Sequence, residues 1–146
     1  QGKAGDMLIS MRNINSIALI DKDSHQLKWI SSQFSEQHSP RITNYGTILV
    51  FDNRGSNKEY GVSRITELDI STKKIVGIWE GTKGFHFESN QMGRLQLLDN
   101  RIFISESDGG RLIELTCTER PISYRCNRKV IFSAPYIDMY VAEIVD

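Results

Sequence analysis

Polar side chains that can exchange protons or bind anions flank one hydrophobic segment of the sequence. His38 and Arg41 come just before the apolar run 47–51, and the run ends in Asp-Asn-Arg at residues 52–54. Histidine exchanges protons near neutral pH, and a guanidinium matches the oxygens of sulfate or carboxylate with two parallel hydrogen bonds. His38 is therefore a candidate nucleophile or general base. Arg41 and Asn53 are candidates for stabilising negative charge on a transferred group.

The same residues also fit a purely structural interpretation. FDNRG and ESDGG contain Asp, Asn and Gly, which take the left-handed conformation and form Asx turns. His38 could be a hydrogen-bonded structural histidine at the start of a strand. Arg12 or Arg41, paired with Asp52 or Glu106, could form a network with no role beyond stability. The residues alone leave both interpretations open.

Short runs rich in Ile, Val, Leu and aromatic residues, separated by Gly, Asn, Asp and Ser, predict an all-β fold. Helical periodicity is almost absent. The aromatic residues Trp29, Trp79 and Phe132 recur at strand ends and are expected in the core. We expect strands near Met7–Met11, Ser16–Ile20, Gln26–Ile30, Arg41–Thr43, Thr47–Phe51, Arg64–Ile70, Ile75–Trp79, Arg94–Leu98, Arg101–Ser105, Arg111–Thr116, Lys129–Phe132 and Tyr140–Val145.

The strands fall into three similar units, in which Ile9, Val50 and Ile104 are equivalent. Each unit consists of a strand, a polar loop, a strand, a turn and a third strand, and the second and third units have one further strand in front. Four strands in roughly 40–50 residues are typical of a β-propeller blade. We therefore expect one propeller domain over residues 1–146, with blades near residues 5–32, 38–81 and 93–133.

The first unit has no leading strand, and a spare strand at residues 139–146 follows the last unit. This C-terminal strand is expected to complete the first blade. Two chains that share terminal strands would then form a homodimer with a closed six-bladed ring. The alternative is that the chain is a piece of a longer six-bladed protein. The start QGKAGD, without Met, suggests a processed or excised product.

Four segments carry a family resemblance: DMLISMRNINSIALID, EQHSPRITNYGTILVFDNRG, SRITELDISTKKIVGIW and SESDGGRLIELT. Together they resemble the arylsulfotransferase-like β-propeller proteins from Gly5 to about Thr116. The resemblance implies a six-bladed propeller that transfers sulfate from one phenolic ester to another phenol. It also implies a transiently sulfated histidine with further His, Asn and Arg groups around it, and no cofactor or metal.

In a blade, the loop entering the inner strand and the loop leaving the second strand lie on the same face of the propeller. The topology therefore predicts one site at the mouth of the central channel. Its catalytic residues would be His38, Arg41 and Asn53. Its ligand-binding residues would be Arg12, Asn13, Asp52, Arg54, His86, Arg94, Glu106, Asp108 and Arg111.

Departures from the family pattern bear on the activity. Ser39 stands where the family usually has Asp, and the chain has only three histidines. His25 lies in a turn, and His86 fits a loop residue better than a catalytic one. These features favour a protein that binds a small anionic or aromatic ligand, with catalysis reduced or lost. The alternative is an aryl sulfate sulfotransferase or esterase that uses His38.

Composition excludes several other classes of protein. Eighteen basic and eighteen acidic residues cancel, and no basic stripe suggests nucleic acid as a partner. The apolar runs, about five or six residues long, are too short to span a bilayer. Cys117 and Cys126 are too few for a zinc site and could be either a disulfide across a hairpin or two thiols. A disulfide, with the resemblance, would favour a periplasmic or secreted protein.

Overall fold

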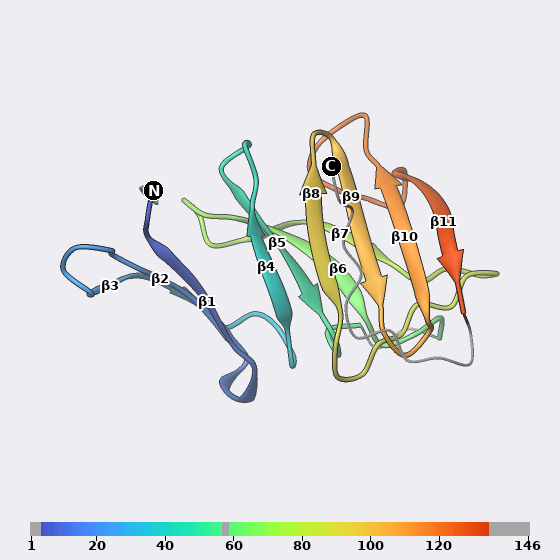
Figure 1. Ribbon diagram of the computed structural model, residues 1–146, viewed down its shortest axis with the longest axis horizontal. Coiled ribbons are helices and arrows are strands. Elements are labelled where there is room, and N and C mark those ends of the chain that lie inside the picture. Colours follow the sequence, from blue (N-terminus) through green and yellow to red (C-terminus); the bar gives the residue numbers. More distant parts are fainter. Residues whose placement is uncertain (1–3, 57–58, 135–146) are drawn as a thin grey trace.

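The computed structural model describes residues 4–56 and 59–134 of the chain, and within these ranges it is all-β, as predicted. Its helical structure there is a single 3₁₀ turn, η1 (Arg12–Ile14). The strands form three antiparallel sheets, ordered β1-β2-β3, β4-β5-β6-β7 and β11-β10-β9-β8 (Figure 1). The strands are β1 (Met7–Met11), β2 (Ser16–Ile20), β3 (Leu27–Ser31), β4 (His38–Ile42), β5 (Thr47–Asp52), β6 (Arg64–Asp69), β7 (Ile75–Glu80), β8 (Arg94–Leu98), β9 (Arg101–Glu106), β10 (Arg111–Thr116) and β11 (Asn127–Ser133).

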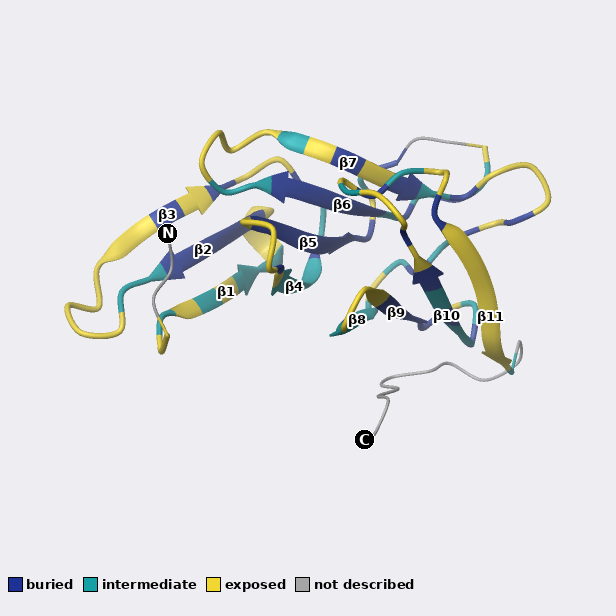
Figure 2. Ribbon diagram, turned by 90° about the horizontal axis from the view of Figure 1, so that it is seen from above, coloured by how far each residue is buried: buried dark blue, intermediate teal, exposed yellow. Residues whose placement is uncertain are grey.

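The sheets fan out from a shared edge. Along this edge β4 contacts both β1 and β8, whereas β3, β7 and β11 lie apart on the outside (Figure 2). The strand expected at residues 139–146 lies outside the described residues. Among the described strands, β1 therefore pairs only with β2.

Two hydrophobic clusters hold the three sheets together, and β5 belongs to both. Ile48 and Val50 pack with the first sheet around Trp29 and Phe34. Leu49 and Phe51 pack on the other side, with the third sheet. Successive side chains of a strand point to opposite faces, so every residue of β5 is buried (Figure 2).

The turns after β2 and β6 are built alike. Asp21 Oδ1 accepts the Ser24 N–H at 2.8 Å, and Asp69 Oδ1 accepts the Thr72 N–H at 2.7 Å. His25 and Lys73 follow in the left-handed conformation, with φ of 56° and 58°. His25 lies in this turn, as predicted, and is exposed. These Asx turns explain how a short segment reverses the chain at both places.

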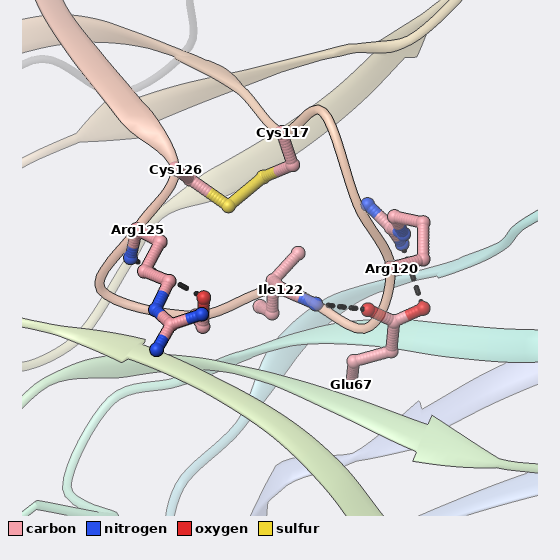
Figure 3. The surroundings of a disulfide bond; sticks show 7 residues. Glu67, Cys117, Arg120, Ile122, Arg125 and Cys126 are labelled. Atoms are coloured by element: carbon pink, nitrogen blue, oxygen red, sulfur yellow. Dashed lines mark hydrogen bonds and ion pairs between the residues drawn. A yellow bond between two sulfur atoms is a disulfide. The ribbon is translucent and has the colours of Figure 1, made fainter.

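In the third sheet, a disulfide-closed loop takes the place of this turn. Cys117 and Cys126 are bonded, so the disulfide alternative is confirmed. The loop lies against the second sheet, where the fully buried Glu67 accepts the Ile122 N–H at 2.7 Å and forms a 2.8 Å ion pair with Arg120 (Figure 3). The contact is so close that a Cβ added at Gly77 would lie 2.5 Å from the Ile122 carbonyl oxygen.

One core prediction is wrong. Trp29 and Trp79 are buried, but Phe132 is 53% exposed. Phe132 lies on β11, the last strand of its sheet, whose residues are all exposed. No further sheet packs on this strand among the described residues, so its aromatic side chain has nothing to cover it.

We expect Glu67→Gln to lower the free energy of unfolding by about 3 kcal/mol, because it leaves the Arg120 guanidinium, which is only 16% exposed, without its counter-charge. Urea denaturation of both proteins measures the change. Glu119→Gln, which removes an exposed carboxylate from the same loop, is the matched control and should leave stability nearly unchanged. Equal stability of Glu67→Gln and the native chain would contradict the role given to Glu67.

A second expectation concerns acid stability. Hydrogen bonds from Ser71 and Thr72 lower the pKa of Asp69 from 3.8 to about 2. The carboxylate therefore stabilises the fold above pH 4, and this contribution is lost as the pH falls through about 2, because the unfolded chain binds the proton first. In Asp69→Asn, the unfolding free energy should depend less steeply on pH between 4 and 2, by up to about one proton. Urea titrations at several pH values measure this slope, and an unchanged slope would refute it.

Candidate functional site

His38 and Arg41 lie on the same face of β4 because of a β-bulge between them. His38 lies opposite Phe51 and Arg41 opposite Leu49, so three steps along β4 match two along β5. Cross-strand neighbours share a face of the sheet. In a regular strand His38 and Arg41 would point to opposite faces, and the extra residue of the bulge places them on the same face. Ser39, inside the bulge, has a positive φ of 49°. The sequence had placed His38 in a loop before this strand.

His38 contacts a buried amide. Its Nδ1 lies 2.7 Å from Oδ1 of Asn53, which follows β5 directly and is fully buried. The Asn53 NH₂ group donates to the carbonyl oxygens of Ser89 at 2.5 Å and Met92 at 2.7 Å. Asn53 is thus fixed by the segment that connects the second and third sheets.

These contacts determine the protonation pattern of the imidazole. Because both carbonyl partners are acceptors, they require the NH₂ group, which leaves Oδ1 of Asn53 to face His38. An acceptor at that position requires Nδ1 of His38 to carry the hydrogen. Nε2 of the neutral ring then holds the free electron pair, which is the form a nucleophile or general base needs.

Positive charge accompanies His38 on this face. Burial and the neighbouring charge of Arg94 lower the pKa of Arg41. Arg41 comes from β4 and Arg94 from the start of β8, and the two strands are in contact. Ser39 joins these strands, since its hydroxyl oxygen accepts the Leu95 N–H at 2.9 Å. Two guanidinium groups close enough to repel each other favour an anion nearby.

The predicted carboxylates have structural partners. Asp52 accepts hydrogen bonds from the Ser35 N–H at 2.7 Å and from its cross-strand partner Arg64 at 2.8 Å. Burial raises the pKa of the Asp52 carboxyl, and these hydrogen bonds oppose the rise.

Glu106 repeats the arrangement in the third sheet. It accepts the Glu88 N–H at 2.9 Å and pairs with Arg111, which lies opposite it on β10. Both carboxylates therefore have structural partners, but the predicted pairing with Arg12 or Arg41 is wrong: the partners are Arg64 and Arg111.

A second group of charged side chains surrounds Glu36 and is separate from the contacts of His38. Glu36 forms ion pairs with Arg12 and with Arg54, the latter at 3.6 Å. Asn13 lies in η1 and is exposed. The sequence did not single out Glu36, although an acidic residue between two predicted arginines was a usable signal.

The remaining predicted residues lie around the segment before β8. The exposed His86 contacts Glu88, with 2.9 Å between Nε2 and Oε2. Asp108 accepts the Asn90 N–H at 2.7 Å and so fixes the loop. Neither residue contacts His38 through the interactions described above.

The structure therefore brings together a smaller group than the sequence predicted. His38 and Asn53 are in direct contact, with Arg41 on the same face and Arg94 beside it. Across residues 4–56 and 59–134, no group of His, Cys, Asp and Glu could hold a metal ion. No helix in the same ranges is long and apolar enough to cross a membrane.

The fold and this group define an all-β protein of stacked antiparallel sheets with a histidine–amide pair at the shared edge. A family model described as "Arylsulfotransferase (ASST)" matches residues 1–124 of the chain. The chain therefore belongs to the arylsulfotransferase family, in agreement with the resemblance seen in the sequence. A search of curated proteins finds no significant match.

The tautomer can be observed directly. At alkaline pH, ¹⁵N NMR should find His38 as the Nδ1–H form, because Oδ1 of Asn53 requires a donor. Asn53→Ala should remove this preference and shift the proton toward Nε2. The exposed His25 is an internal reference that should not change. A native His38 with its hydrogen on Nε2 would contradict the assignment.

Proposed function

We propose that the chain is an arc of a β-propeller that transfers a sulfuryl group from an aryl sulfate to a phenol, with Nε2 of His38 as the nucleophile. One observation carries this proposal. The contact between His38 and Asn53 directs the electron pair of the imidazole to Nε2, while the amide itself is fully engaged. A purely structural histidine has no need of a fixed free nitrogen.

The reaction proceeds in two balanced steps. The electron pair of Nε2 attacks sulfur and forms the N–S bond, while the bond between sulfur and the aryl oxygen breaks and its two electrons leave with the phenolate. A second phenol then loses its proton to water or buffer and attacks sulfur. The N–S bond breaks, and its electrons return to Nε2. Arg41 stabilises the charge on the sulfuryl oxygens.

Asn53 has a different role from the one expected for it. The sequence suggested that Asn53 stabilises charge on the transferred group, but its NH₂ hydrogens are directed to Ser89 and Met92. In this proposal Asn53 is a positioning residue that acts through His38. It orients the ring and fixes its tautomer.

The replacement of Asp by Ser at position 39 does not argue against activity. Its hydroxyl oxygen accepts the Leu95 N–H, a role that a carboxylate oxygen also fills. This weakens the main reason for expecting lost catalysis. A ligand-binding function remains the second candidate. The observation that favours it is the positive charge that Arg41 and Arg94 bring to the same place.

The arrangement of the sheets supports the propeller. Three sheets that share one edge and spread apart outside are the geometry of consecutive blades around an axis. The disulfide and the family also support a periplasmic or secreted location.

A turnover assay with 4-nitrophenyl sulfate and a phenol acceptor tests the proposal. His38→Ala should lower the rate by at least about 10³-fold, because it removes the covalent step. Arg41→Ala should lower kcat/KM by a smaller factor while the protein still forms the intermediate. Mass spectrometry of the quenched native enzyme should find one added sulfuryl group, which His38→Ala should lack.

His86→Ala is the matched control, since it removes an exposed imidazole outside this group. It should retain native turnover. Absence of turnover by the folded native chain would refute the enzyme. If 4-nitrophenyl sulfate then bound to the native chain and more weakly to Arg41→Ala, the binding function would take its place.

A further inference from the structure

At matching positions, the side chains on the two outer faces of the chain are more exposed than those on the inner faces. Ile48 and Val50 in the second sheet, and Ile102 and Ile104 in the third, are at most 1% exposed. In each case the preceding sheet, or the segment leading from it, covers them. The matching residues of the first sheet, which has no preceding sheet among the described residues, are Met7 and Ile9, and they are 46% and 39% exposed.

The third sheet, at the opposite end, shows a corresponding difference in exposure. In the second sheet Trp79 pairs through Ile65 with Phe51, and the third sheet covers this row so that Trp79 is 3% exposed. The corresponding residue of the third sheet, Phe132, occupies the same place in its row and is 53% exposed. Figure 2 shows the contrast between the alternating burial of β7 and the fully exposed β11.

Consecutive sheets pack against each other twice within the chain. Each exposed face therefore resembles one side of such a sheet–sheet interface. The leading face, marked by Met7 and Ile9, is the side that receives a preceding sheet. The trailing face, marked by Phe132, is the side that receives a following one. What fits each face is the other, because the sheets inside the chain stack in that way.

We propose that a second copy of this chain supplies both missing neighbours. The leading face of each copy docks on the trailing face of the other. Three blades of a six-bladed ring span about half a turn, so two copies related by a two-fold axis close it. The closed ring places a wall of the second copy across the axis from His38.

Charge agrees with this arrangement. The chain has no net charge, with eighteen residues of each sign, so two copies do not repel each other as a whole. The exposed residues that mark the two faces, Met7, Ile9 and Phe132, are apolar, and apolar side chains form the centre of stable interfaces.

Light scattering after gel filtration tests the proposal on the full 146-residue chain. The expected mass is twice 16.7 kDa. Ile9→Asp and Phe132→Asp each place a charge in both interfaces of the ring, so each should weaken association by at least about 100-fold and give the monomer mass. Ile14→Asp and Tyr124→Asp, at exposed positions away from these faces, are the controls and should remain dimeric.

A mixing experiment distinguishes this pairing from others. A heterodimer of Ile9→Asp with Phe132→Asp has both charges in one interface and an unaltered second interface. The mixture should therefore recover dimer that neither variant forms alone. If the same faces paired with each other, mixing would restore nothing, and the proposal would be overturned.

Two other results would also overturn it. One is a native chain that stays at 16.7 kDa up to high concentration, as expected if further blades of a longer chain fill these faces. The other is a dimer that both aspartate variants leave intact. Because the measurement is of mass and not of turnover, its failure is distinguishable from failure of the His38 mechanism.

Discussion

β5 belongs to both hydrophobic cores at once, because its alternate side chains point to opposite faces of the middle sheet. A strand buried on both sides cannot shift by one residue without exchanging the side chains of two cores. This fixes where β5 ends, and therefore where Asp52 and Asn53 lie. This constraint also fixes the geometry of the candidate site, because Asn53, whose amide positions His38, follows the strand directly.

The two cross-strand ion pairs anchor the segments that lead into β4 and β8. Asp52 binds the Ser35 N–H and Glu106 binds the Glu88 N–H, each supported by an arginine on the next strand. At the equivalent place the first sheet has Met11 opposite Ser16, and no such carboxylate. These carboxylates do not contact His38, but they set the course of the chain into the strands that carry His38 and Arg94.

Much of this fold could be predicted from alternation and turn residues, because both are local properties of the sequence. The start of β4 could not, since a bulge with Ser39 and Pro40 looks like a loop in the sequence. The partners of Asp52 and Glu67 were also missed. The register of β5 and β6 brings Arg64 to Asp52, and packing between sheets brings Arg120 to Glu67. Neither the register nor this packing can be read from the order of residues in the chain. For His38 the residue was identified, but the tautomer depended on main-chain carbonyls at Ser89 and Met92.

The loop closed by Cys117 and Cys126 has a consequence for how the chain folds. Its contacts with Glu67 join residues 53 and 55 positions apart in sequence, so they raise the contact order of the molecule. Stacked sheets that touch only their neighbours tend to unfold one at a time. A buried ion pair between the second and third sheets couples these two into one cooperative unit. The first sheet, joined to the others through a smaller cluster, is then the part that separates at the lowest cost.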